Sequence, residues 1–519
     1  MQANDIRDLK RAIYGLHRRS ERSDKDKLID TFVDIGNIFD VLSSNDHQVI
    51  FGRRGTGKTH ILYYLLHYIY NANDIGIYVD LTNLGSSNSV YSDASLPISE
   101  RGTRLLVDTL AEIYNGLLDY ITGNNNLDLN SLDWRLFDRF ADSFTHVKVE
   151  GSISTIATSA NSISQTNYAD AAASTDGLSL RLSREKQRHH TAEYTERRDG
   201  AEVHYIHFGE VVSALRELTS ALSDKRIWIL LDEWSNIPIE LQPMLADLFR
   251  RTFMTINNVI VKIAAIDHRS NFIITKSRGN YLGLELGADI SADVNLDEYL
   301  VVDVNYTHAI DFYKNLFYKH ILNTDHAKNA GLAFNRPDEL ISKLFTQHNT
   351  FVELVKASEG VPRDAINIAI KAAQVSGNGD NKISIPNVRE AARQWYLNDK
   401  EATVRSREKA YMLLQWVIDK VIKHRRARAF LLEVGKADQL IDFLFDSRVL
   451  HILKRNVSTH DRPGHRYDVY KIDYGCYVDL ISTSGNPSAE PLLGIDVPSD
   501  DYRAIRRAIL DIDEFYSSL

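Results

Sequence analysis

Eight residues near the N-terminus constrain the fold more than any other feature of this chain. They read Gly-Arg-Arg-Gly-Thr-Gly-Lys-Thr over 52–59, with a short apolar run, 48–51, before them and an apolar helical pattern, 60–70, after them. A strand, a glycine-rich loop and a helix in this order form a phosphate-binding loop, whose backbone N–H groups converge on a phosphate. Such a loop belongs to a parallel sheet covered by helices on both faces, so the pattern predicts an α/β fold.

The residue types in this loop predict a site for a nucleoside triphosphate and Mg²⁺. Lys58 is expected to reach the β- and γ-phosphates, and Thr59 to offer its hydroxyl to the metal ion. The partial positive charge at the start of the following helix also favours the phosphates. The predicted binding residues are Gly52, Arg53, Arg54, Gly55, Thr56, Gly57, Lys58, Thr59 and His60.

Two acidic residues end a second buried strand. Asp232 and Glu233 directly follow the apolar run 227–231, which places both carboxylates at the sheet edge where ligands of open α/β sheets bind. Asp232 is expected to hold Mg²⁺, directly or through water, and Glu233 to polarise the water that attacks the γ-phosphate. The alternative is a pair of solvated acids at a strand end, and the phosphate loop in the same chain argues against it.

Polar residues at two further places complete the predicted catalytic set. Asp267 follows the apolar run 259–266, so we expect it between the carboxylates and the phosphates, where it orients the water; His268 is the second candidate. Arg363 follows a glycine and a proline at a predicted helix entry, from which it can contact the γ-phosphate. The alternatives are ordinary strand-end polarity for Asp267 and a local ion pair for Arg363.

The composition is that of an ordinary soluble globular protein. With 519 residues, 44% of them apolar and 25% charged, about three domains are expected. No apolar run is long enough to cross a bilayer, and the N-terminus reads as a charged helix, not as a signal peptide. A single cysteine, Cys476, suits a reducing cytoplasm and a buried thiol. The net charge of −9 argues against a broadly basic surface but leaves room for a local basic patch.

The pattern along the chain divides it into three parts. Residues 1–304 are expected to form the α/β core, 305–400 a helical lid and 401–519 a winged-helix domain with a tail. Within the core, about 145–205 is rich in small polar residues and then densely charged, so we predict an insertion that is mobile or projects. Its adjacent His189 and His190 point to different faces of any regular element, so no metal site is expected there.

Apolar periodicity also predicts the order of elements at both ends of the chain. Residues 26–42 are expected to form one helix ahead of the first strand. The C-terminal part is expected to contain three helices and then a hairpin, in outline a winged helix. The helices are predicted at 406–424, 427–434 and 437–448, and the strands at 449–458 and 467–472.

Taken together, these residues resemble the AAA+ ATPases, and within them the origin-recognition (initiator) group. The resemblance is carried by 52–59, Asp232-Glu233, Asp267, the run Gly360-Val361-Pro362-Arg363 and the helical pattern at 383–391. It implies a P-loop core, a helical lid and a C-terminal winged helix, with ATP and Mg²⁺ as cofactors and ATP hydrolysis as the activity. Bacterial members resemble standalone ATPases, some of them associated with defence against phage.

The chain departs from this group in two places. The insertion ahead of Asp232 is not part of the group's pattern. No residue stands out as the arginine finger that would reach a neighbouring subunit's γ-phosphate; the candidates are Arg250, Arg251 and Arg269. Whether the chain forms a ring or filament therefore stays open.

The predicted winged helix gives mixed signals about DNA. Its third helix carries Asp438, Asp442 and Asp446 on one face, which would repel phosphates. Its wing and the junction between its first two helices are basic. We therefore expect these two regions to contact the DNA backbone, with little readout of the bases. The alternative is a module that binds a partner protein. The wing residues are Lys454, Arg455, His460, Arg462, His465 and Arg466, and the junction residues are Lys423, Arg425, Arg426 and Arg428.

The sequence therefore predicts a nucleotide-gated switch that acts on DNA or on a partner protein. Two alternatives remain open. One is a scaffold or signalling subunit that holds ATP and exchanges it slowly. The other is a ring-forming motor, which would require a homo-oligomer.

Overall fold

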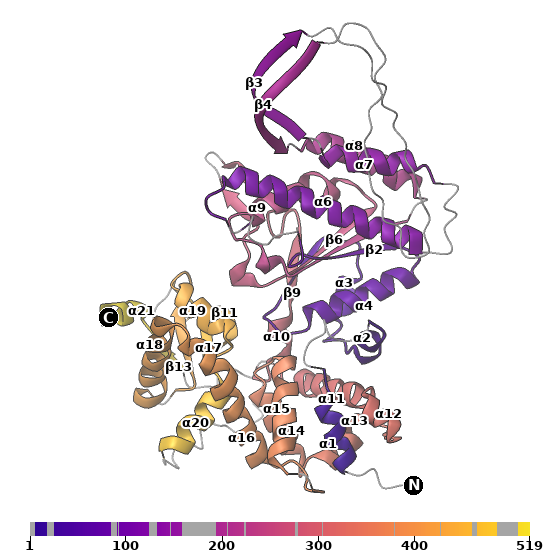
Figure 1. Cartoon of the computed structure of the whole chain (residues 1–519). Helices are drawn as coiled ribbons and strands as arrows, with labels where there is room; N and C mark the ends of the chain where they lie inside the picture. The colour runs from indigo at the N-terminus through magenta and orange to yellow at the C-terminus, as the bar shows by residue number, and fades with distance from the viewer. Residues whose placement is uncertain are drawn as a thin grey trace.

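The molecule is elongated, with an α/β core at one end and a helical part and a small mixed α/β part at the other (Figure 1). The computed structural model describes residues 6–17, 25–84, 91, 93–123, 132–145, 147–157, 194–204, 206–222, 225–275, 279–303, 305–377, 379–425, 427–458, 464–484 and 507–518. Within those residues, none of the helices has both the length and the apolar character that crossing a bilayer requires.

The core contains a five-stranded sheet in the order β2-β5-β6-β1-β9, in which all neighbouring strands run parallel. The α/β prediction is therefore confirmed. Polar β9 (Ser291–Asn295) is half-exposed and was not expected, because its sequence lacks the apolar run that marks a central strand. The other strands are β1 (Gln48–Phe51), β2 (Ile75–Asp80), β5 (Ile227–Asp232) and β6 (Val259–Ala265).

Alternate residues of each strand point to opposite faces of the sheet and enter separate apolar clusters. Ile50, Trp228 and Leu230 pack with α4 (Lys58–Asn71) on one face. Val49, Ile227 and Ile229 pack on the other face. There, the covering helices are α6 (Ile98–Gly123), α7 (Trp134–Thr145), α8 (Phe208–Ala221) and α9 (Gln242–Arg251). The strands read as unbroken apolar runs because both faces are covered.

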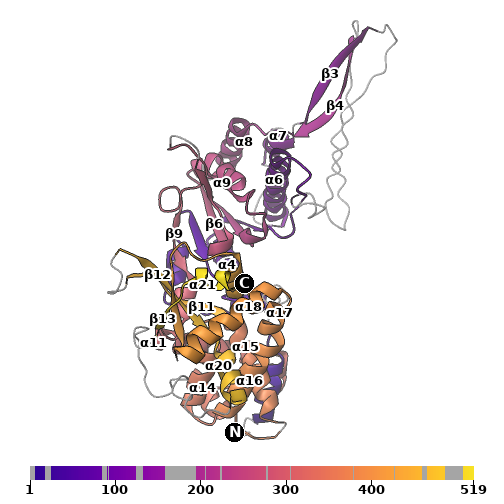
Figure 2. The ribbon, with the colours of Figure 1, turned by 90° about the vertical axis from the view of Figure 1, so that its left-hand side faces the viewer.

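The predicted insertion contains an antiparallel two-stranded ribbon. β3 (Val147–Ala157) pairs with β4 (Tyr194–His204) along its full length, between α7 and α8. Both views show the ribbon extending away from the core (Figures 1 and 2). Residues 158–193, with His189 and His190, lie outside the described residues.

The prediction of a single helix over 26–42 is wrong. The segment forms two helices, α2 (Lys25–Thr31) and α3 (Ile38–Leu42). Gly36 and Asn37 between them have left-handed backbone, with φ of 58° and 65°. The Asp34 carboxylate accepts hydrogen bonds from the backbone N–H groups of Ile35 and Phe39, which stabilises this turn in place of a continuous helix.

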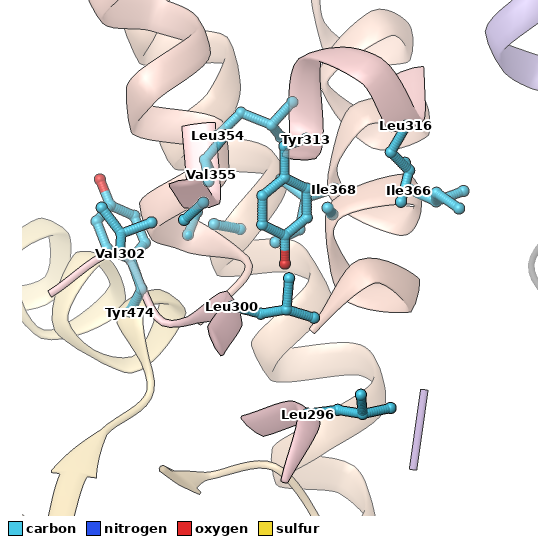
Figure 3. Packing of buried hydrophobic residues seen from close by; sticks show 14 of the residues in the cluster. Leu296, Leu300, Val302, Tyr313, Leu316, Leu354, Val355, Ile366, Ile368 and Tyr474 are labelled. Carbon is cyan, nitrogen blue, oxygen red and sulfur yellow. The ribbon is translucent and has the colours of Figure 1, made fainter. Parts of the chain in front are cut away.

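The helical part follows the core through α10 (Leu296–Leu300). Figure 3 shows its apolar interior, in which Tyr313 and Leu354 lie near Leu300 of α10 and Tyr474 of the C-terminal part. One apolar cluster therefore runs from the sheet through the helical part into the C-terminal part. The helices are α11 (Tyr306–Leu322), α12 (Asp325–Asn329), α13 (Pro337–Leu344), α14 (His348–Ala357), α15 (Pro362–Val375), α16 (Ile385–Trp395) and α17 (Ala402–Arg405), with α1 (Ile6–Tyr14) packed beside them.

The C-terminal part has a winged-helix architecture, with one error in the prediction. Residues 427–434 do not form a helix: β10 (Ala429–Glu433) pairs with β12 (Arg466–Ile472) and β13 (Arg507–Ile509). A short apolar run is compatible with either structure, and here strand pairing decides. The hairpin of β11 (Leu450–Ser458) with β12 is confirmed. The remaining helices are α18 (Glu408–Val417), α19 (Gln439–Asp446), α20 (Tyr474–Ser484) and α21 (Ile512–Ser517).

Candidate functional site

The carboxyl ends of parallel strands meet at one edge of the sheet, and the predicted residues gather there. The phosphate loop follows β1, Asp232 ends β5, and Asp267 follows β6. Asp80 ends β2 directly opposite Asp232. The sheet therefore assembles this edge from four strands.

Glycines give the phosphate loop its shape. Gly55 and Gly57 have φ of 89° and 101°, and Gly57 caps the N-terminus of α4. The Lys58 ammonium lies inside the loop, where Nζ donates to the carbonyls of Gly52 and Arg53 at 2.8 and 3.1 Å. A Cβ added to Gly55 would lie 2.8 Å from the Cβ of Arg363, so glycine at 55 lets the loop and α15 touch.

Arg363 lies in the first turn of α15, as predicted. Its backbone N–H donates to the carbonyl of Gly55 at 3.3 Å, which joins the helical part directly to the loop. Burial lowers the pKa of Lys58, the nearby carboxylates raise it, and the positive charge of Arg363 lowers it.

Asp232 is held in a fixed orientation. It is 1% exposed, and its Oδ1 accepts from the backbone N–H of Glu233 while its Oδ2 accepts from the hydroxyl of Tyr78, both at 2.8 Å. Burial and the charge of Asp232 raise the pKa of Tyr78, so its hydroxyl stays protonated and donates. No sequence motif marked Tyr78 as part of the site.

Glu233 has the strained, left-handed backbone typical of functional positions, with φ of 57°. Burial and the neighbouring charge of Asp232 raise its pKa, which moves this carboxyl toward the range useful for a general base. Asn236 donates to Glu233 Oε2 at 3.3 Å and to the hydroxyl of Thr82, just after β2, at 2.8 Å. The buried ammonium of Lys58, the Thr59 hydroxyl and the Asp232 carboxylate form a donor set that fits a triphosphate with Mg²⁺.

A cavity of about 330 Å³ lies between the segment ahead of β1 and the first helices after β9. It is bounded by the turn 33–36 and by α10 and α11, including Tyr299 and Asn305. The chain leading to this turn lies along α4, because the His60 Nε2–H donates to the carbonyl of Leu28 at 2.6 Å. A larger cavity of about 690 Å³ opens at the amino end of β1, around residues 45–47 and 286–293, away from the phosphate loop.

Arg53 contacts all three parts of the molecule. It is 3% exposed, and its Nε donates to Asp297 at 2.8 Å and its Nη2 to the carbonyl of Glu359 at 3.1 Å. Its Nη1 donates to Nδ1 of His451 at 2.5 Å. Burial and the charge of Arg53 hold the pKa of His451 well below its usual value, so the imidazole is neutral. The Arg53 side chain is therefore bound by partners within the chain, and its predicted role in nucleotide binding stays a prediction.

The tip of β6 contacts the winged helix. Asp267 forms an ion pair with Arg455 of β11 at 3.0 Å. His268 and Arg269 both bind Asp446 of α19, at 2.8 and 2.5 Å. An arginine of the wing therefore binds the Asp267 carboxylate in this structure. The position of Asp267 between the acidic pair and the phosphates stays a prediction.

Two of the three acidic residues of α19, which are predicted to repel DNA phosphates, have partners within the chain. Asp446 binds the β6 tip, and Asp438 caps its own helix by accepting from the N–H groups of Leu440 and Ile441. Phe445 lies between Arg53 and His268, with its ring 5.3 Å from the Arg53 guanidinium and 5.0 Å from the imidazole. Tertiary packing therefore brings Asp446 to two cations of the core, while Asp438 caps its own helix.

Several predicted basic contacts are engaged within the chain. Arg428 is buried beside Glu359, so it is not available to DNA, and His465 pairs with Glu433. The arginine-finger candidates are also paired: Arg250 and Arg251 contact Asp247, and Arg269 contacts Asp446. Lys454, Arg425 and Arg466 are exposed, Lys423 is exposed beside Asp419, and Arg426, His460 and Arg462 lie outside the described residues.

Comparison with known proteins finds a family model that is similar to the segment around the phosphate loop. Residues 17–77, which include the phosphate loop, match the family model described as ORC-CDC6-like. This segment is therefore similar to that family. The predicted resemblance to initiator-type AAA+ ATPases is confirmed there, and the observed α/β core and winged-helix part agree with it. Comparison with curated proteins gives no significant match.

Two solved structures are similar to nearly the whole chain, at low identity. Cdc6p from Pyrobaculum aerophilum is 12% identical, with 90% of this chain and 95% of that chain covered and a TM-score of 0.33. The Aeropyrum pernix Orc1 protein, solved in complex with DNA, is 13% identical, with 89% and 95% covered and a TM-score of 0.31.

Proposed function

We propose that this ORC-CDC6-like chain is an ATP-binding and ATP-hydrolysing switch. One observation carries the proposal: the sheet edge brings the phosphate loop, Asp232 and Glu233 together beneath Arg363. In this proposal Lys58 and Arg363 bind the phosphates and Asp232 and Thr59 hold Mg²⁺. The metal ion, when bound, would stabilise the negative charge that develops on the phosphate.

Glu233 is the proposed general base, and it accepts a proton from the attacking water. Asn236 bonds to its carboxylate and orients it. The nucleoside base is proposed to occupy the cavity between the turn 33–36 and α11, because that cavity is large enough for a purine and the chain leading to the turn is hydrogen-bonded to His60, next to the loop. Asp267 remains a proposed water-orienting residue once Arg455 leaves it.

The contacts of the winged helix support coupling between nucleotide state and partner engagement. Arg455 and α19 engage the tip of β6, which is the proposed γ-phosphate-sensing position. A side chain cannot make these contacts and bind a DNA phosphate at once. We therefore propose that a nucleotide-dependent shift of Asp267 and Arg363 releases the winged helix for its partner.

The proposed partner is the DNA backbone. Exposed Lys454 and Arg466 are proposed to contact it, and Arg455 to do so after its release. The predicted wing residues Arg462 and His465 are proposed to add to this contact. A partner protein is the alternative. A slow-exchanging ATP scaffold is a second candidate function, favoured by the burial of Lys58 under the contact between Arg363 and Gly55. The ring-forming motor has less support, because the described finger candidates are paired within the chain. DNA maintenance or phage defence is the biological setting that we propose.

Two variants of the full chain test the ATPase. Lys58→Met should weaken binding of a fluorescent ATP analogue by about 100-fold, since hydrogen bonds to charged groups are lost. Glu233→Gln should keep that binding and lower the rate of phosphate release by about 10²- to 10⁴-fold. Wild-type protein that binds nucleotide without releasing phosphate would favour the scaffold. Equal nucleotide binding by wild type and Lys58→Met would refute both functions.

A further inference from the structure

Tyr78 connects three elements of the nucleotide site. It lies on β2 opposite Leu230 of β5, so Tyr78, Leu230 and Asp232 face the same side of the sheet. Its hydroxyl reaches across the strand pair and donates to Asp232 Oδ2 at 2.8 Å. Its ring stacks on Tyr63 of α4, with centroids 4.6 Å apart and planes 24° from parallel.

This contact fixes the carboxylate from one side while the backbone fixes it from the other. Asp232 Oδ1 accepts from the N–H of Glu233, whose backbone is left-handed. Rotation of the Asp232 carboxylate would break both hydrogen bonds together. The orientation of the carboxylate and the position of the Glu233 side chain are therefore linked through one group.

We propose that Tyr78 is a positioning residue, which orients Asp232 toward Mg²⁺ and, through Asp232, steadies Glu233. The proposal rests on the proposed ATPase function and adds to it a residue outside the phosphate loop and the acidic pair. Tyr78 itself contacts neither phosphate nor metal in this scheme. Its hydroxyl acts as the outer hydrogen-bond partner that orients a metal-binding carboxylate.

A purely structural role for Tyr78 makes a different prediction. The stack on Tyr63 and the packing against the apolar cluster use the ring alone. Tyr78→Phe keeps that ring and removes only the hydroxyl. If Tyr78 is structural, this variant should behave as wild type at every metal concentration.

The experiment compares the full chain with Tyr78→Phe and with a matched control, Tyr68→Phe. Tyr68 lies on α4, is 44% exposed and contacts Phe39 edge to face. Mn²⁺ binding in the presence of saturating ADP is followed by electron paramagnetic resonance, and binding of fluorescent ADP is measured in EDTA. We expect Tyr78→Phe to weaken Mn²⁺ binding by about 10- to 100-fold, as for other outer partners of metal ligands.

ADP binding in EDTA should be the same in all three proteins, which also shows that the variant is folded. An unchanged Mn²⁺ affinity in Tyr78→Phe, with normal ADP binding, would overturn the inference and leave the ATPase proposal intact. Equal loss of ADP binding in EDTA would also overturn it, because the hydroxyl would then support the fold and not the carboxylate. Absence of Mn²⁺ binding in the presence of ADP in the wild type would instead refute the ATPase function.

Discussion

At the scale of single residues, burial decides what each polar side chain of the loop does. Arg53 and Arg54 are adjacent, yet Arg53 is buried among three acceptors from separate parts of the chain and Arg54 is exposed. Only a guanidinium offers donors in several fixed directions, so arginine suits position 53. This residue links the phosphate loop to the winged helix.

The substitution Arg53→Lys should therefore lower the free energy of unfolding by about 3 kcal/mol, because it leaves buried acceptors without donors. Arg54→Lys, the neighbouring control, should change it by less than about 0.5 kcal/mol. Urea unfolding monitored by tryptophan fluorescence checks both values. Equal stability of the two variants would show that the contacts of Arg53 contribute little.

At the scale of elements, packing of α19 against the core gives different properties to acidic residues on the same helix face. Burial alone would raise the pKa of Asp446, but the hydrogen bond from His268 and the charge of Arg269 hold it below its usual value. One turn earlier, burial raises the pKa of Asp442 instead. Two carboxylates on one helix face therefore differ because only Asp446 meets the β6 tip.

Asp446→Asn should release α19 from His268 and Arg269 and expose the wing. We expect several-fold tighter, salt-sensitive DNA binding, because a phosphate-repelling charge is also removed. Asp442→Asn removes the same charge from the same helix without breaking the contact, so its affinity for DNA should increase less. Fluorescence anisotropy with a DNA duplex at two salt concentrations measures the difference. Identical DNA affinities for the two variants would show that the contact between α19 and the tip of β6 does not limit DNA binding.

At the scale of the whole molecule, buried ion pairs join the helical part to the winged helix. Lys471 of β12 contacts Asp303 and Glu359 at 2.6 and 2.7 Å. Lys400 contacts Asp364 and Asp473 at 2.9 and 2.5 Å. These ion pairs are expected to break together, because a partial separation of the two parts would leave buried charges without partners.

Lys471→Met should cost about 3–5 kcal/mol of stability at this junction, because two buried carboxylates lose their cation. The expected result is faster proteolysis between residues 401 and 428 and a larger radius of gyration in X-ray scattering. Lys436→Met is the control, since Lys436 contacts Asp513 at the exposed surface. A compact, protease-resistant Lys471→Met protein would contradict the idea of a joined junction.

The local sequence determined the phosphate loop, the acidic pair after β5 and the entry of α15. These depend on glycine conformations, helix starts and strand ends, which involve neighbouring residues only. For the same reason the α/β class and the hairpin of β11 and β12 were predictable. Periodicity failed at residues 427–434, where a short apolar run fits a helix or a strand, and at β9, which has no apolar run.

Only the tertiary structure decided which polar groups face one another. The partners of Arg53 lie 244, 306 and 398 residues away, and those of Asp446 lie 177 and 178 residues away. Hydrogen bonds and ion pairs act over a few ångströms, so their partners depend on how the sheet edge, α15 and the winged helix pack. That packing brings Asp446 of α19 to His268, places Arg455 on Asp267 and sets Tyr78 against Asp232.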